Sequence, residues 1–444
     1  MTEKASGSCL SAMTLHPVRS VALGYLAYIT IGWIVLSLPF SHGDEGVSGL
    51  DALFTSASAV STTGLTTVST GQGYSFFGQL AILTLIQLGG IGYMTLGSFV
   101  VLSRSSLLTD TRREISKVVF SMPKGFQVEK FIKSVVIFTI ATEIAGIISL
   151  YYVLRQAGVS NPVWMSVFHS VSAFCTAGFG LYDDSFESMR GNISVNIILG
   201  VLSYLGAIGF IVFVDVWRRL SGQSAGITLT SRIILFTTVA ISFTATMLFF
   251  IIEPTIQELP PHERLVASAF QVMTSLTTVG FNTIPIGALS QASLFLLIML
   301  MVIGASPSGT GGGLKTTTFS ALFGVIRSSF MGQETVTFWR KEIPQERIRV
   351  AIASFGFYMT TLIGGCFLLA LTETFPFESI VFEAASALGT VGLSTGITAT
   401  LSPIGKLIII VLMFCGRLGP LAFGIALFLP SATLEEITQE DLAI

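Results

Sequence analysis

Long apolar runs, separated by short polar stretches, make up most of the chain. Several runs hold about 18 or more mostly apolar residues, enough to cross the hydrocarbon core of a bilayer as a helix. They are Val18–Leu38, Phe76–Leu102, Val195–Val216, Ile233–Ile252 and Leu407–Pro430. Few charged residues precede the first run and no small-residue cleavage site follows it, so we expect a retained helix and not a signal peptide. The pattern predicts an all-α membrane protein that crosses the bilayer several times.

A short signature recurs four times between these runs. The copies read FTSASAVSTTGL, FHSVSAFCTAGF, FQVMTSLTTVGF and FEAASALGTVGL, and they begin at Phe54, Phe168, Phe270 and Phe382. Ten residues after each Phe stands a Gly: Gly64, Gly178, Gly280 and Gly392. Four residues after each Phe stands a hydroxyl residue: Ser58, Ser172, Thr274 and Ser386. Repetition of this kind indicates one structural unit used several times.

Each signature lies between two longer apolar runs, so one unit contains a helix, a half-helix, a polar stretch and a helix. The half-helices are too short to span the bilayer and begin near prolines, at Pro39, Pro162, Pro260 with Pro261, and Pro376. Non-helical backbone at membrane depth is tolerated only where it is buried in protein or faces a watery cavity. We therefore expect four tandem helix–pore loop–helix repeats around a central pseudo-fourfold pore, with eight transmembrane helices and four re-entrant half-helices.

The repeats divide almost the whole chain. We expect a cytosolic N-terminus (1–17), repeat 1 (18–103), repeat 2 (130–219), repeat 3 (230–328), repeat 4 (346–430) and a cytosolic tail (431–444). The predicted filter segments are Thr62–Leu65, Cys175–Phe179, Thr277–Phe281 and Gly389–Leu393.

The filter segments predict binding of a dehydrated monovalent cation. Gly adopts backbone angles that other residues avoid, so successive carbonyls can face one ion and replace its hydration shell. The C-terminal ends of the half-helices add partial negative charge. No ring of Asp or Glu occurs in the signatures, which argues against a Ca²⁺ or Mg²⁺ filter. The candidate ion-binding residues are Ser61, Thr62, Thr63, Gly64, Cys175, Thr176, Ala177, Gly178, Thr277, Thr278, Val279, Gly280, Gly389, Thr390, Val391 and Gly392.

A single Thr-x-Gly is more typical of a helix C-cap or a turn than of a pore. Four copies at identical offsets favour the pore instead.

Composition and charge placement agree with a membrane protein. Hydrophobic residues make up 51% of the chain and charged residues 11%, against roughly 25% charged in soluble domains. The net charge of −2 indicates no nucleic-acid partner. Basic residues concentrate in the loops 104–133 and 327–349 and at Arg218, Arg219 and Arg232, so the positive-inside rule places both termini in the cytoplasm. Cys9, Cys175, Cys366 and Cys415 show no CxxC spacing, so neither a disulfide framework nor a zinc site is expected.

The third repeat is interrupted after its signature. The apolar run Ala292–Ile303 breaks into GASPSGTGGGLKTTT, where Pro307 and several glycines prevent a continuous helix. We expect a loop within the membrane at 304–316, just beneath the filter. It is not a Walker A motif, because Leu314 and not Gly precedes Lys315. Lys315 and Arg417 lie near membrane depth and should face the pore or a partner, or snorkel to a helix end.

The four repeats, with TTGL at Thr62–Leu65, TAGF at Thr176–Phe179, TVGFN at Thr278–Asn282 and TVGL at Thr390–Leu393, resemble the Trk/Ktr/HKT superfamily of K⁺ transporters. The compact length and the closing GRLGPL (Gly416–Leu421) look most like the Ktr-type membrane subunit. The resemblance implies K⁺ bound at the filter, and K⁺ uptake across the plasma membrane with Na⁺ as a frequent requirement. It also implies a homodimer with one pore per subunit. Nucleotide would be bound only by a separate cytosolic regulatory ring of RCK type, and this chain would carry no cofactor of its own.

The same resemblance assigns gating to the interrupted segment and to one arginine. The implied gating residues are Gly304, Ser306, Pro307, Ser308, Gly309, Gly311, Gly312, Gly313, Lys315 and Arg417. The loop would block the pore and move aside, and the positive charge of Arg417 would act as an electrostatic barrier below the filter.

Three filter positions bear on selectivity. Cys175 and Thr176 stand where Ktr-like proteins often have Asn in the second repeat. Gly64 favours K⁺, because relatives with Ser at that place tend to pass Na⁺. A Na⁺ or poorly selective monovalent cation transporter of the same fold is therefore the alternative within the family.

Other functional classes fit less well. An intramembrane enzyme using Glu143 and His169 lacks an HExxH or GxSxG motif and leaves the four signatures unexplained. An alternating-access transporter would have inverted repeats, whereas all four units here share one orientation. Glu143 and His169 have ordinary roles as a hydrogen-bonded buried Glu and a packed His, and we expect Asp51 and Glu383 to cap the starts of the half-helices.

Overall fold

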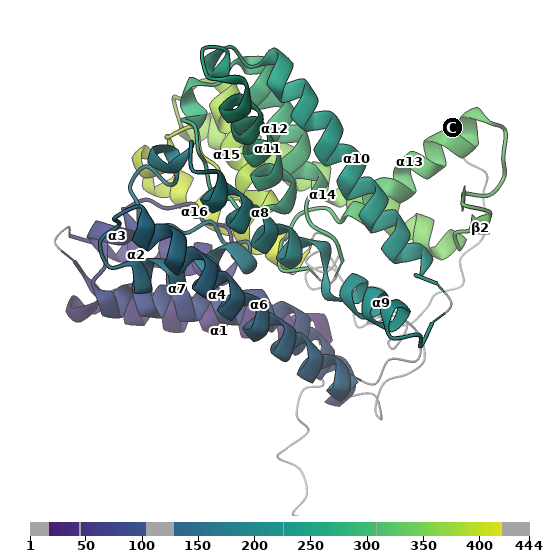
Figure 1. Cartoon of the computed structure of the whole chain (residues 1–444), viewed down its shortest axis with the longest axis horizontal. Coiled ribbons are helices and arrows are strands. Elements are labelled where there is room, and N and C mark those ends of the chain that lie inside the picture. Colours follow the sequence, from purple (N-terminus) through teal and green to yellow (C-terminus); the bar gives the residue numbers. More distant parts are fainter. Residues whose placement is uncertain (1–16, 44–45, 104–127, 225, 308, 420–444) are drawn as a thin grey trace, which may run out of the picture.

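The computed structural model describes residues 17–43, 46–103, 128–224, 226–307 and 309–419 (Figure 1). Helices dominate these ranges. Apart from an isolated bridge between His42 and Tyr74, their β structure is one antiparallel pair, β1 (Thr337–Phe338) and β2 (Lys341–Glu342). The predicted all-α class is confirmed. Cys9, Arg104, Lys124, the tail 431–444 and Ser308 of the predicted gating set lie outside the described residues.

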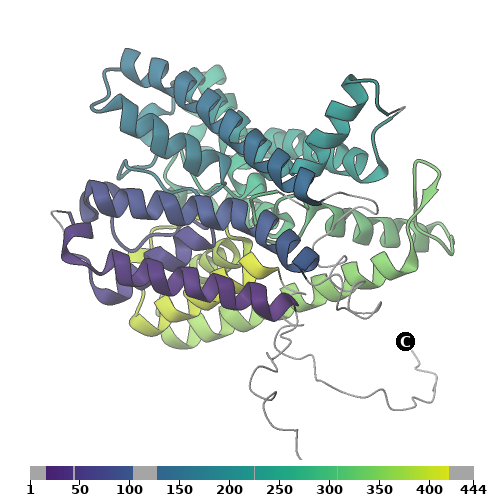
Figure 2. The same ribbon diagram turned by 90° about the horizontal axis from the view of Figure 1, so that it is seen from below.

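Each repeat contributes two outer helices or helix pairs and one central half-helix. Repeat 1 has α1 (Pro17–Leu36), the half-helix α2 (Gly49–Val60), the short α3 (Thr70–Gly73) and α4 (Phe76–Ser103). Repeat 2 has α6 (Val128–Gln156), α7 (Pro162–Phe174), α8 (Ile193–Ile208) and α9 (Phe210–Leu220). Repeat 3 has α10 (Leu229–Ile252), α11 (Pro261–Thr277), α12 (Gln291–Ile303) and α13 (Thr316–Phe330). Repeat 4 has α14 (Gln345–Thr372), α15 (Phe377–Gly389) and α16 (Pro403–Leu418). Figure 2 shows α1, in purple, running beside α4.

The half-helices α2, α7, α11 and α15 lie in the centre of the fold. Their signature phenylalanines are at most 3% exposed, whereas Ile31, Phe236 and Phe367 on the outer helices are 57–63% exposed. A lipid-facing outer surface and a buried centre are what a membrane solvent requires, because the non-helical filter backbone can lie at membrane depth only inside the protein.

The half-helices begin at proline or a polar cap. Pro162 and Pro261 open α7 and α11, and Pro376 is the N-cap of α15. The expectation that the first half-helix begins near Pro39 is wrong. Pro39 opens a separate 3-10 turn (Pro39–Ser41), and α2 starts at Gly49 because the Ser48 hydroxyl accepts the Asp51 N–H at 3.1 Å.

The multi-pass prediction is supported by several apolar helices. By length and composition, three described helices can each cross a membrane: Lys133–Gln156, Leu229–Ile252 and Gln345–Thr372. Shorter apolar helices occur at Val21–Leu36, Phe76–Gly92 and Gln291–Ile303. α16 ends at Leu418, where Gly419 has a φ of 85°, so the predicted run Leu407–Pro430 is not one continuous helix.

The predicted span Val195–Val216 is also not one straight helix. It divides at Gly209 into α8 and α9, which are bent by 93°. Gly209 has φ 91° and ψ 141°, a conformation open to Gly and costly for other residues. At this break the carbonyl oxygens of Gly206 and Ala207 accept hydrogen bonds from the N–H groups of Thr310 and Ser306, both at 3.0 Å. The bend therefore supplies the acceptors that hold the interrupted segment of repeat 3.

Replacing Gly209 by Ala should destabilise the protein, because a Cβ disfavours the backbone angles at the bend. We expect the free energy of unfolding to fall by about 1–3 kcal/mol, measured by thermal or denaturant unfolding in detergent. Gly24→Ala is the matched control, since a Cβ at Gly24 in α1 would meet nothing within 4 Å. Equal stability of the two variants would contradict this account of the bend.

Candidate ion-conduction site

The four signature glycines form a closed ring. An ideal Cβ placed on any one of them would come within 3.0–3.1 Å of the Cα of the next, in the order Gly64, Gly178, Gly280, Gly392 and back to Gly64. The same Cβ would overlap the carbonyl oxygen of the residue before that next glycine: Ala177, Val279, Val391 and Thr63 respectively. The ring follows the sequence order of the repeats, so one axis passes through four equivalent backbone segments.

The backbone bends in the same way at every filter segment. The Thr two residues before each Gly has φ between 49° and 59°, and each filter Gly has φ between 67° and 93°. The residue between them donates its N–H back to the carbonyl of the hydroxyl residue of its half-helix, at 2.8–3.1 Å. These four donors are Thr63, Ala177, Val279 and Val391. Two left-handed residues, the Thr and the Gly on either side of this donor, turn the backbone out of each half-helix and into the filter segment.

The recurrent hydroxyl residue supports the filter glycine in several ways. Ser58 Oγ accepts the Gly64 N–H and Ser386 Oγ accepts the Gly392 N–H, both at 3.1 Å. Ser172 Oγ instead donates to the Phe179 carbonyl at 2.8 Å. Thr274 Oγ1 has no hydrogen-bond partner within the described residues. The hydroxyl at this signature position therefore braces the filter from its own half-helix in three of the four repeats.

The residue directly after each signature Phe contacts the segment beyond the filter, which the sequence analysis did not predict. In three repeats its side chain hydrogen-bonds to the segment that follows the filter. His169 Nε2 accepts the Leu181 N–H at 3.1 Å, and Gln271 Nε2 donates to Thr283 Oγ1 at 3.5 Å. Glu383 Oε1 accepts the Thr395 N–H at 3.2 Å. The signal was available, because all four copies place a polar residue there, Thr55 in the first.

The expectation that Glu383 caps the start of a half-helix is wrong. It lies fully buried in the middle of α15, and its carboxylate also accepts a hydrogen bond from Thr398 Oγ1, beyond the filter segment, at 2.9 Å. Asp51, in contrast, lies in the first turn of α2 as expected.

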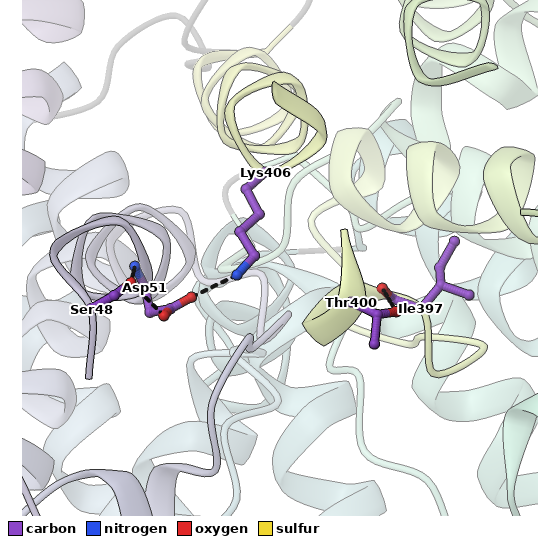
Figure 3. Close-up of polar contacts among 5 residues, drawn as sticks. All are labelled: Ser48, Asp51, Ile397, Thr400 and Lys406. Atoms are coloured by element: carbon purple, nitrogen blue, oxygen red, sulfur yellow. Dashed lines mark hydrogen bonds and ion pairs between the residues drawn. The ribbon is translucent and has the colours of Figure 1, made fainter. Parts of the chain in front are cut away.

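An ion pair joins the first and fourth repeats. Asp51 Oδ1 lies 2.8 Å from Lys406 Nζ on α16, and Ser48 Oγ donates to Asp51 Oδ2 at 2.5 Å (Figure 3). Both charged side chains are about 15% exposed (14% and 15%). The pair spans the junction at which the last repeat meets the first and so helps to close the ring.

The interrupted segment of repeat 3 lies directly against one end of the ring. Thr310 Oγ1 lies 3.1 Å from Thr176 Oγ1, and the Gly312 N–H donates to Thr390 Oγ1 at 3.0 Å. Thr62 Oγ1 lies 3.5 Å from the Thr310 carbonyl, and a Cβ at Gly311 would overlap Thr278 Oγ1. The loop thus touches the threonines of all four repeats.

The other predicted gating residues are distributed along this loop. Gly304 and Gly313 have φ of 53° and 71° and turn the chain at either end of it. Ser306 donates to Ala207, Gly309 packs against the same carbonyl, and Pro307 is buried. Lys315 Nζ donates to the Gly311 carbonyl at 2.8 Å, so this cation is bound to the loop itself.

Arg417, on α16 of repeat 4, is buried at 2% exposure and joins the loop to repeat 1. Its guanidinium donates to Thr62 Oγ1 at 2.8 Å and to the Thr310 carbonyl. It also donates to the carbonyls of Gly89 and Gly90 on α4. Arg417, which we expected to face the pore or a partner, therefore has partners within the protein. It bridges a filter threonine, the interrupted loop and α4.

Comparisons with known proteins agree with this geometry. The sequence profile of the TrkH family, described as cation transport protein, matches residues 29–437. The Ktr system potassium uptake protein B of Bacillus subtilis (strain 168) is 35% identical over 412 residues, which is 92% of each chain. The potassium/sodium uptake protein NtpJ of Enterococcus hirae is 34% identical over 416 residues, 91% of each chain.

A solved structure shares the fold. The crystal structure of the potassium transporter TrkH from Vibrio parahaemolyticus superposes with a TM-score of 0.73 at 20% identity, covering 95% of this chain and 86% of that one. This confirms the predicted four-repeat pore-loop architecture. A family of transporters also excludes the intramembrane enzyme considered above. With a family match over most of its length and two relatives above 30% identity, the chain belongs to the TrkH family of cation transport proteins, the Trk/Ktr group that its repeats resemble.

Proposed function

We propose that this protein takes up K⁺ across the cell membrane through the ring of four filter glycines. The observation that carries the proposal is the closed contact of Gly64, Gly178, Gly280 and Gly392 around one axis. The names of the relatives support the choice of ion, since the Bacillus subtilis protein is called a potassium uptake protein.

The filter segments would replace the hydration shell of the ion with carbonyl oxygens. The N–H groups of Thr63, Ala177, Val279 and Val391 are committed to the half-helices. The carbonyls of the same segments can therefore face the axis. The candidate ion-binding residues of the four segments would bind the ion through these carbonyls or through their hydroxyl groups. The half-helices end at the ring, so their C-terminal partial negative charge adds to the attraction for a cation.

The interrupted loop would be the gate. In the described structure it contacts the threonine of every filter segment, and Arg417 and Lys315 place two positive charges beside it. A cation leaving the filter would meet this loop and the field of Arg417. Opening requires the loop to move away from the threonines. Its glycines can adopt many backbone angles, so the loop can rearrange with little backbone strain.

We infer the orientation in the membrane from the basic residues. Arg218 and Arg219 end α9, Arg327 lies in the last turn of α13, and Lys341 lies in β2. Figure 1 shows α9, α13 and β2 on the same side of the molecule. We assign this side, and with it both termini, to the cytoplasm. On this cytoplasmic side, a separate nucleotide-binding regulatory ring would bind to a homodimer of this chain. Na⁺ would act as an activating ion.

A Na⁺ or poorly selective pore is the second candidate, because the Enterococcus hirae relative is named for both ions. Gly64 favours the K⁺ pore. An added Cβ there would overlap the Ala177 carbonyl oxygen, and φ at Gly64 is 92°. A side chain at this position would displace a filter oxygen.

Gly64→Ser should therefore lower K⁺ over Na⁺ selectivity by about tenfold or more, a loss of about 1.4 kcal/mol of discrimination. The measurement is Rb⁺ and Na⁺ uptake by K⁺-uptake-deficient cells that express the protein. Gly24→Ser, at a site with no neighbour within 4 Å, is the control and should behave as the wild type. Absence of K⁺ uptake by the wild type would refute the function, and unchanged selectivity of Gly64→Ser would refute the filter assignment.

Deleting the segment from Ser306 to Gly313 should raise the K⁺ flux about tenfold, because the deletion removes the loop that covers one end of the ring. The readout is K⁺ flux into proteoliposomes under an imposed gradient, which also separates a pore from a pump. Thr310→Ala removes only the hydroxyl contacts to Phe174 and Thr176 and should raise flux less. Unchanged or lower flux through a monodisperse deletion variant would show that the loop is not the gate.

A further inference from the structure

A buried carboxylate lies behind the second filter segment. Glu143, on the outer helix α6, is 6% exposed and stands within an apolar, membrane-spanning run. An ionisable side chain at such depth is costly and normally has a specific partner and role. The conduction path described above does not use Glu143.

Its partners connect three elements of two repeats. Gln87 of α4 donates from Nε2 to Glu143 Oε2 at 3.0 Å. The Cys175 thiol donates to Gln87 Oε1 at 3.3 Å and lies 3.9 Å from Glu143 Oε1. Gln87 and Glu143 therefore form a polar pair that holds the Cys175 side chain, and we name these three residues the repeat-2 brace. Cys175 is the first residue of the second filter segment and directly precedes Thr176.

The equivalent filter position in the other repeats is held differently. Ser61 Oγ bonds Thr63 Oγ1 at 2.7 Å, and Thr277 Oγ1 donates to the Met273 carbonyl at 2.7 Å, so both bonds stay inside their own signature. Gly389 has no side chain. Within the described residues, the second repeat is therefore the one whose first filter residue is hydrogen-bonded to the outer helices.

The packing around the brace leaves little freedom. A Cβ on Gly90 would come within 2.8 Å of Cys175 Sγ, so α4 presses directly on the thiol. The Ser170 hydroxyl of α7 donates to the Glu143 carbonyl at 2.9 Å, which fixes α6 against the half-helix. Within the same turn of α4, the carbonyls of Gly89 and Gly90 accept hydrogen bonds from Arg417. The same turn of α4 thus contacts the brace on one side and the arginine beside the loop on the other.

We propose that Glu143 and Gln87 are positioning residues for the second filter segment and that their hold on Cys175 sets how strongly the pore discriminates K⁺ from Na⁺. Neither residue touches the ion path. They act through Cys175, whose backbone carbonyl belongs to the filter and already accepts the Thr176 hydroxyl at 2.8 Å. Filter oxygens distinguish two monovalent cations only if their positions are maintained by a supporting shell. The inference rests on the proposed function of the glycine ring.

The test compares Glu143→Leu, Gln87→Leu and the double variant with Glu143→Gln. The readout is the ratio of Vmax/KM for Rb⁺ to that for Na⁺, with Vmax and KM recorded separately. Each Leu variant should lower the ratio about tenfold, mainly through KM. The double variant should lower it no further, since both changes break one unit. Glu143→Gln should keep most of the wild-type ratio, because its carboxamide oxygen can still accept the hydrogen bond from Gln87.

Controls separate the brace from folding and from the general function. Glu346→Leu removes an exposed glutamate at the start of α14 and should keep the wild-type ratio. If Glu143→Leu does not yield a monodisperse membrane protein, Gln87→Leu decides alone. Wild-type ratios in the Leu variants, or effects that multiply in the double variant, would overturn the brace while K⁺ uptake by the wild type continued. Absence of K⁺ uptake by the wild type would instead overturn the proposed function.

Discussion

The constraint on which the structure depends is the contact of four glycines that leave no room for a Cβ. A Cβ added to any filter Gly would lie only 3.0–3.1 Å from the Cα of the next filter Gly. The fourth Gly contacts the first in the same way, so the ring is closed. Such proximity requires four backbones to bend alike, which the left-handed Thr and Gly pairs achieve. The hydroxyls of Ser58 and Ser386 and the ion pair of Asp51 with Lys406 then hold the bends and the junction in place.

A second constraint is that polar backbone inside a membrane protein must be satisfied by the protein. The interrupted loop of repeat 3 meets this condition by bonding outside its own repeat. Its N–H groups donate to Gly206 and Ala207 at the bend of α8, and to Thr390 of the fourth filter segment. Arg417 in turn donates to loop and α4 carbonyls. The loop, the bend at Gly209 and the buried arginine are therefore parts of one arrangement beneath the ring.

Much of this could be predicted from the sequence, because the decisive features are local and repeated. Four Gly residues at one offset, and a helix broken by Pro307 and several glycines, indicate the filter and the loop without tertiary information. What could not be predicted depends on contacts between distant segments. The bend at Gly209 is needed because the N–H groups of the distant loop require acceptors. Glu383 accepts from Thr395, in a loop segment whose path cannot be predicted from the sequence. The approach of Gln87 to Cys175 joins residues 88 positions apart.

In the proposed mechanism, the transported ion loses its water at the glycine ring. The most direct measurement is the structure of the protein with Rb⁺ or Tl⁺ in place of K⁺, using anomalous scattering to locate the ion. We expect anomalous density on the axis between Gly64, Gly178, Gly280 and Gly392, and we expect it to disappear when Na⁺ replaces the heavier ion. Density at another place in the protein, with the ring unoccupied at saturating ion, would contradict it.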